Sequence, residues 1–137
     1  MKRKKIIFLV LALLCLIGCI WGWVAYHKSR PELDSVKADV QISSEQLYAA
    51  YSSDENKANK LYLNKVIEVS GIVVSVQHDK AEASIQLNAG KGSPGGINCA
   101  LRSNENLPKE GILIHIKGRC TGYLMDVSLV DAVIISK

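Results

Sequence analysis

The sequence predicts a mainly β fold: a small five-stranded barrel that follows one amphipathic helix and an N-terminal hydrophobic helix. Three observations lead to this expectation. Residues 6–26 carry no charged side chain, residues 43–62 place apolar residues at helical spacing, and apolar and polar residues alternate in five runs from residue 65 onward. With 137 residues, the chain has room for one domain beside the hydrophobic helix.

The uncharged stretch is long enough to cross a membrane. Its 21 residues would span about 31 Å as a helix, which matches the hydrocarbon core of a bilayer. Lys2, Arg3, Lys4 and Lys5 precede it, and tryptophan and tyrosine residues lie at its far end, as in a helix whose N-terminus stays in the cytoplasm. We therefore expect a basic stub and a signal-anchor helix over residues 1–28. The protein would cross the cell membrane once and hold its C-terminal domain outside the cytoplasm, in the periplasm or at the cell surface.

A lipoprotein signal is the alternative interpretation of the same segment. Residues 16–19 read Leu-Ile-Gly-Cys, which resembles a bacterial lipobox in which Cys19 is lipidated. Residues 20–25 stay apolar after that cysteine, which favours an uncleaved helix. Both alternatives tether the domain to the cell envelope.

Charge and aromatic content argue against a nucleic-acid partner. From residue 31 onward, 11 basic residues face 13 acidic ones, so this part carries a formal charge of −2, and its only aromatic residues are four tyrosines. Nucleic-acid binding needs a basic surface and rings on which bases stack. The membrane is therefore the expected partner, together with an envelope protein or a glycan.

Residues 29–41 contain a proline and mixed charges without an apolar period, so we expect a spacer there and a domain over residues 42–137. Ser43 and Gln46 have the spacing of a helix N-terminal capping box. Leu47 and Tyr51 begin a helical apolar stripe that Asp54 interrupts, so we expect the helix to break near residues 52–56.

Five alternating runs predict the strands. The first, Lys65–Gln77, changes phase near Gly71, which indicates a bend or bulge. The others cover residues 82–87, 97–102, 112–117 and 125–136. Five short strands with a long, bent first strand favour an OB-fold, with an SH3-like barrel as the rival architecture.

The order of several motifs resembles one known family. Lys65–Gly71, Gly96–Cys99 and above all Cys120–Val127 (Cys-Thr-Gly-Tyr-Leu-Met-Asp-Val) are similar to the tRNA_anti-like OB-fold family of small exported or membrane-anchored bacterial proteins, many of them described as lipoproteins. The resemblance covers residues 38–136 and implies an OB-fold in the cell envelope. The family name records a likeness in fold to anticodon-binding domains and does not imply tRNA binding.

Fold analogy gives the candidate site. OB-folds bind ligands on their second and third strands and on the loops after strands one and four. On this chain that surface would carry six residues: Gln86, Asn88, Asn98, Arg102, Tyr123 and Asp126. The function expected is a tethered binding or interaction module for an oligosaccharide, a peptide or an envelope protein. A nucleic-acid-binding domain is the alternative, and an enzyme is the third class.

No catalytic motif, cofactor or metal site is expected. Residues 90–95 match the pattern G-x-G-x-x-G, but they lead into a strand rather than a helix, so they read as a loop. A zinc site from Cys99, His115 and Cys120 is disfavoured because alternation places His115 on the opposite face from Cys120. Cys99 and Cys120 both point inward, and the sequence leaves open whether they form a disulfide or remain two buried thiols.

Overall fold

The computed structural model describes residues 2–26, 33 and 35–136, and it contains two compact units, residues 1–32 and 33–137. The first unit holds helix α1 (Lys2–Tyr26). Within α1, Lys4–Tyr26 is long and apolar enough to cross a membrane, with a mean hydropathy of 2.7 over its most apolar window. The predicted end of the anchor at residue 28 and spacer residues 29–32 and 34 lie outside the described residues.

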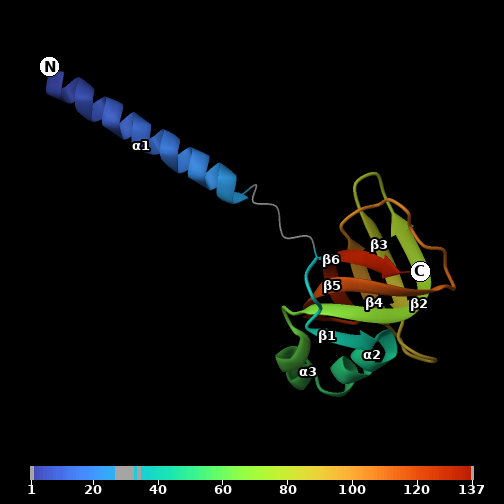
Figure 1. Cartoon of the computed structure of the whole chain (residues 1–137). Coiled ribbons are helices and arrows are strands. Elements are labelled where there is room, and N and C mark those ends of the chain that lie inside the picture. The colour runs from blue at the N-terminus through green and yellow to red at the C-terminus, as the bar shows by residue number, and fades with distance from the viewer. Residues whose placement is uncertain (1, 27–32, 34, 137) are drawn as a thin grey trace. The chain divides into compact units, whose positions relative to one another are not determined.

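The second unit is a closed barrel (Figure 1). Its strands are β2 (Val66–His78), β3 (Ala83–Asn88), β4 (Gly96–Leu101), β5 (Leu113–Tyr123) and β6 (Val127–Ser136). They follow the order β2-β3-β4-β6-β5, and pairing of β5 with β2 closes the barrel. Strands β4 and β6 are parallel, whereas the other barrel pairs are antiparallel. This is the five-stranded OB barrel that the sequence predicted.

Strand β2 is long because its two halves pair with different strands of the barrel. Val66–Ile72 pairs with β5, and Val73–His78 pairs with β3 after a register shift between Val73 and Ser75. The predicted change of phase is therefore present, but the irregularity lies a few residues after Gly71. Gly71 instead allows the first residue of helix α2 (Ser44–Ser53), the buried Ser44, to pack against β2, because a Cβ at Gly71 would lie 2.5 Å from the Ser44 Oγ.

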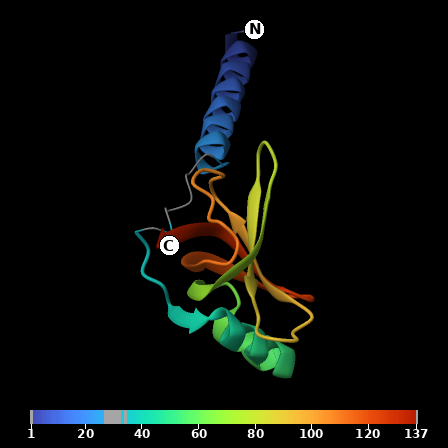
Figure 2. The same ribbon diagram turned by 90° about the vertical axis from the view of Figure 1, so that its right-hand side faces the viewer.

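Two short helices close one end of the barrel, as Figure 2 shows. They are α2 (Ser44–Ser53) and α3 (Glu55–Tyr62). The Ser43 side chain caps α2 by accepting from the Gln46 N–H at 3.2 Å, and Asp54 separates the helices and caps α3 by accepting from the Lys57 N–H. The predicted cap and the predicted break are both confirmed. Leu47, Tyr48, Tyr51 and Ala58 bury their side chains against the strands.

A sixth strand was not predicted. Strand β1 (Val40–Ser43) pairs in parallel with Ile67–Ser70 of β2. Four residues are too few for alternation to identify a strand from sequence, and this segment was assigned in part to the spacer. Before β1, the Lys117 ammonium donates to the carbonyl oxygens of Leu33 (3.2 Å) and Val36 (3.0 Å). The compact unit therefore begins well before residue 42.

Cys99 and Cys120 are free, buried thiols, so the disulfide considered above is not formed. The register explains why: both cysteines pair with Leu129, one from each side of β6. Two strand spacings separate them by roughly 9–10 Å, beyond the ~7 Å between Cα atoms that a disulfide can bridge. The Cys120 sulfur instead lies 3.3 Å from the Tyr51 hydroxyl, within hydrogen-bond distance.

Candidate functional site

Two rows of outward-facing side chains cross β2, β3, β4 and β6. In the first row the partners are Ser75, Gln86, Asn98 and Ser128, one from each strand in that order. In the second row Gln77 pairs with Ser84, and Ser84 pairs with Ala100. Both rows are polar or small because they face away from the core. Together they form the outer face of the two central strands, β3 and β4.

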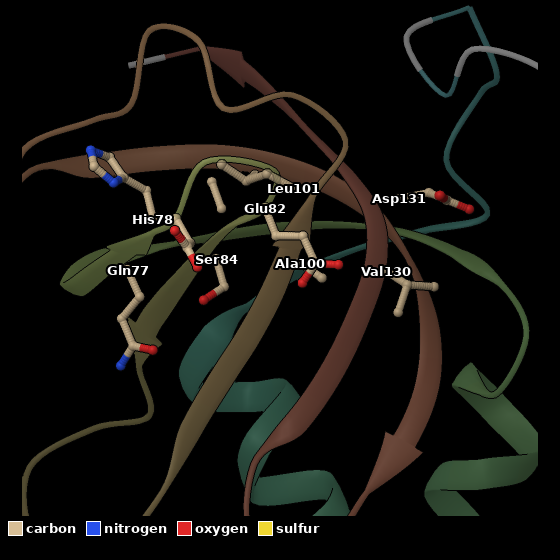
Figure 3. Close-up of a pocket in the computed structure, with 10 residues that line it drawn as sticks. Gln77, His78, Glu82, Ser84, Ala100, Leu101, Val130 and Asp131 are labelled. Atoms are coloured by element: carbon tan, nitrogen blue, oxygen red, sulfur yellow. The ribbon is translucent and has the colours of Figure 1, made fainter.

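A groove of about 540 Å³ lies over the second row. Figure 3 shows Gln77 and His78 on one side of it, Val130 and Asp131 on the other, and Ser84 and Ala100 between them. The loop between β2 and β3 adds Asp79 and Glu82 to the lining. A backbone hydrogen bond closes this loop, because the Asp79 N–H donates to the Glu82 carbonyl at 2.8 Å. Only two residues lie between them, so the geometry of the loop is fixed.

A β-bulge shapes the far wall of the groove. Cys99 pairs with Leu129 and Leu101 with Ala132, so β6 has one more residue than β4 over this interval. The extra residue lets β6 present both Val130 and Asp131 opposite Ala100. Asp131 takes a left-handed backbone conformation with φ of 52°. Aspartate is among the few side chains that adopt this region readily, which suits it to the bulge.

The groove is acidic. Asp79, Glu82 and Asp131 contribute three carboxylates, and His78 is the one lining residue that can carry positive charge. Lys80 lies beside it, in an adjoining hollow that His78, Asp79 and Asn104 also line. None of the ten lining residues is phenylalanine, tyrosine or tryptophan. The lining therefore offers mainly hydrogen-bond acceptors, with donors from the Gln77 amide and the Ser84 hydroxyl.

Three of the six predicted site residues lie close together: Gln86 and Asn98 in the first row, and Asp126 beside them. Asp126 Oδ1 accepts from the Gly96 N–H at 2.6 Å and lies 3.5 Å from Gln86 Nε2. Asn98 is the cross-strand partner of Gln86. This cluster adjoins the groove because Gln86 and Ser84 are neighbours on the same side of β3. Asp126 fixes the loop between β5 and β6 against the start of β4.

The other three predicted residues do not join this cluster. Asn88 accepts from the Gly90 N–H at 2.8 Å and so shapes the loop over residues 90–95, which is a loop as predicted. Arg102 lies beyond the end of β4, where its backbone N–H donates to Ala132. Both residues flank the face rather than form it.

Tyr123 belongs to the helix-capped end of the barrel. Its ring stacks on Tyr51 at 5.7 Å and meets Tyr48 edge-on at 5.9 Å. A hydrogen bond with Tyr48 raises the pKa of Tyr123, and burial, followed by the contact with Cys120, raises that of Tyr51. These rings pack the helices onto the barrel, so Tyr123 is not a stacking platform on the β3–β4 face.

Sequence reasoning missed the groove itself. Gln77, Ser84 and Ala100 sit on the outward phases of predicted strands, so their direction could have been deduced from the alternation. Glu82 was expected in the second strand but lies in the loop before β3. The bulge at Asp131 could not be predicted from the alternation, because it depends on the parallel pairing of β6 with β4. Among the residues that the structure describes, no three His, Cys, Asp or Glu side chains lie close enough together to hold a metal ion.

Comparison with known proteins gives the same fold. A crystal structure described as a "putative nucleic acid-binding lipoprotein" from Klebsiella pneumoniae is 15% identical, with a TM-score of 0.57, over 71% of this chain and 92% of that one. Asparaginyl-tRNA synthetase from Entamoeba histolytica is 16% identical, with a TM-score of 0.40, over 54% of this chain and 21% of the synthetase. At 15% identity, the likeness to the Klebsiella protein concerns the fold alone. No curated protein sequence matches the chain. The sequence model of one family matches residues 1–134, and on that match the protein belongs to the tRNA_anti-like family of OB-fold proteins.

Proposed function

We propose that the protein is a membrane-tethered, extracytoplasmic binding module whose ligand occupies the groove over β3 and β4. The observation that carries the proposal is the position of this groove. It lies over the two strands, and beside the loop after the first barrel strand, with which OB-folds bind their ligands. A concave site with a few fixed polar groups is what a small or extended ligand requires.

The chemistry of the lining favours a neutral or cationic ligand. The acceptors of Asp79 and Glu82 suit hydroxyl, amide N–H or ammonium groups, and Gln77 and Ser84 can add hydrogen bonds. An oligosaccharide, a peptide segment with basic residues, or an envelope protein that presents such a segment would each fit. We propose that the groove binds its ligand without catalysis.

Nucleic acid is the alternative ligand, and the Klebsiella protein, which is described as nucleic acid-binding, favours it. A phosphate backbone would meet carboxylates in this groove, where single-strand binders place lysine and arginine beside stacking rings. Lys80 and Arg102 add positive charge at the margin, but the carboxylates lie in the groove itself. The balance of charge therefore supports the neutral or cationic ligand.

The location outside the cytoplasm is supported by α1 and by the basic residues before it. Lys4–Tyr26 fits a membrane anchor or a signal sequence, and residues 2–5 are all basic. The topology can be tested with a cysteine at exposed Lys57 and a membrane-impermeant maleimide on intact cells or spheroplasts. Labelling without permeabilisation is expected. Labelling only after lysis would place the domain in the cytoplasm.

Site-specific photo-crosslinking in living cells tests the groove. A photoreactive amino acid at Ala100, on the exposed floor of the groove, should give a discrete adduct that the same residue at Lys57 of α3 does not give. Glu82→Lys should abolish the adduct because it reverses a charge of the lining. An adduct that forms equally at both positions, or that survives Glu82→Lys, would contradict a ligand in this groove.

A further inference from the structure

An exposed apolar patch lies on the barrel away from the groove. Ile72 and Leu113 are cross-strand partners on β2 and β5, and their side chains are 46% and 56% exposed. Val74 follows Ile72 on β2 and is 51% exposed. We call these three residues the β2–β5 patch. Ile135, near the end of β6, is also 43% exposed, and the next residue, Ser136, pairs with His115 of β5.

The chain enters the domain along the same strand. Leu33 is 2% exposed, and Lys117 fixes the backbone around it by donating to the carbonyls of Leu33 and Val36. Lys117 follows Leu113 by four residues on β5, with the same alternation phase, so about 13 Å separates the two positions. Leu33 therefore joins the barrel close to the β2–β5 patch.

The length of the connecting chain limits how far this part of the domain can lie from the end of α1. Residues 27–32 separate Tyr26 from Leu33. Seven residue steps span at most about 25 Å even when fully extended. If α1 crosses a bilayer, the point at which the chain joins β5 stays within that distance of the helix end. A short tether also raises the effective concentration of the surface around it, so that weak contacts suffice.

We propose that the β2–β5 patch rests on the lipid surface and thereby holds the β3–β4 face toward the aqueous phase. This inference depends on the membrane anchoring proposed above. Exposed aliphatic side chains gain by leaving water for the interfacial region of a bilayer. The exposed ionisable residues near the patch are Lys109 and Glu110, which precede β5, and His115, whose Nδ1 lies 3.7 Å from Glu68. These charges are mixed, so the contact should not require anionic lipid.

A second apolar feature provides an internal comparison. Leu124 and Met125 are 94% and 69% exposed in the loop between β5 and β6. They are more exposed than any residue of the β2–β5 patch, but they lie at the opposite end of β5 from Leu113. If exposure alone decided the lipid contact, this loop would make it. The chain that leads from α1 meets the barrel at Lys117, which is closer to the β2–β5 patch than to this loop.

The test places a nitroxide spin label at Val74 of the full chain, reconstituted into phosphatidylcholine vesicles. The background carries Cys15→Ala and Cys19→Ala, and the two remaining cysteines are buried. Labels at Asn98, on the groove face, and at Leu124 are the matched controls. The Val74 label should be more accessible to oxygen than to a water-soluble nickel complex, and both controls should show the reverse.

The patch variant Ile72→Ser/Leu113→Ser should move the Val74 label into water, while an unchanged label spectrum at Asn98 shows that the barrel is intact. A Val74 label as accessible to nickel as the Asn98 label would overturn the inference, and so would a Leu124 label in the lipid phase. Flotation separates the two proposals. A chain that does not float with the vesicles disproves the anchor, whereas a chain that floats with Val74 in water disproves only the docking of the patch.

Discussion

Asp126 should be the most important side chain for holding the loop between β5 and β6. Its Oδ1 atom accepts from the backbone N–H of Gly96, a buried residue, at 2.6 Å. The contact with Gln86 Nε2, at 3.5 Å, is at the limit of a hydrogen bond and should contribute little. The loop also packs closely against the chain before β4, since a Cβ at Gly95 would lie 2.2 Å from the Met125 carbonyl oxygen.

Asp126→Ala should lower the free energy of unfolding by about 2–3 kcal/mol. A hydrogen bond to a charged group contributes about 1.5–3 kcal/mol, and the substitution leaves the buried Gly96 N–H without its acceptor. Asp126→Asn keeps an acceptor oxygen but removes the charge, so it should cost about half as much. Gln86→Ala should cost less than about 0.5 kcal/mol.

Hydrogen exchange measured by NMR on the full chain in detergent micelles gives both the local and the global effect. The Gly96 amide should exchange faster in Asp126→Ala, and the slowest core amides should report the loss of global stability. Asp79→Ala is the matched control, because Asp79 accepts from the Lys80 N–H in an exposed turn. Unchanged protection of Gly96, or an equal loss in Asp79→Ala, would refute the reasoning.

Three further predictions concern the core and the entry of the chain. Ile114→Asp buries an unpaired carboxylate at a fully buried position and should unfold the barrel, whereas His115→Gln, one residue further and partly exposed, should change stability by less than about 0.5 kcal/mol; urea unfolding compares them. Lys117→Met removes the ammonium that donates to two carbonyls, so it should lower the free energy of unfolding by about 2 kcal/mol and speed proteolysis before β1. Proteolysis at the wild-type rate would argue against that role of Lys117. Burial raises the pKa of the Cys99 thiol above its ordinary 9.0, so the folded state keeps its proton where the unfolded chain loses it. The free energy of unfolding should therefore fall by about 1 kcal/mol between about pH 9 and pH 10. In Cys99→Ala this part of its pH dependence should be absent.

Most of the barrel could be predicted because its strands alternate cleanly. Ile85, Leu87, Ile97 and Ile114 are all fully buried, as their phase required. The Asp54 break could also be read, because a short acidic side chain both ends one helix and caps the next. Strand β1 could not be predicted, because its formation depends on an edge that β2 provides.

The behaviour of Lys117 shows a second limit of alternation. Its phase on β5 is outward, which predicts exposure from the sequence, yet it is only 8% exposed because Leu33 and Val36 lie against its ammonium group. The cysteines show a third limit. Alternation predicts that Cys99 and Cys120 point inward, but only the strand order shows that β6 lies between them.

For the site, fold analogy selected the face that carries the proposed groove but only part of the residues that line or adjoin it. Gln86 and Asn98 lie in the first polar row, whereas Tyr123 packs under the helices. The analogy selected large polar side chains on the face. The groove depends instead on a small residue, Ala100, and on the bulge at Asp131, whose position follows from the pairing of distant strands.

The β3–β4 face of this OB-fold should accept neutral or cationic ligands and reject polyanions. The most direct measurement is the affinity of the full chain in neutral detergent micelles for two probes of opposite charge, hexalysine and a ten-residue oligodeoxythymidine, at low and high salt. Hexalysine should bind more tightly than the oligonucleotide, Asp79→Asn/Glu82→Gln should weaken hexalysine binding several-fold, and the oligonucleotide should show no salt-sensitive binding. Tight oligonucleotide binding that falls steeply with salt, and that the double variant leaves unchanged or strengthens, would contradict this expectation.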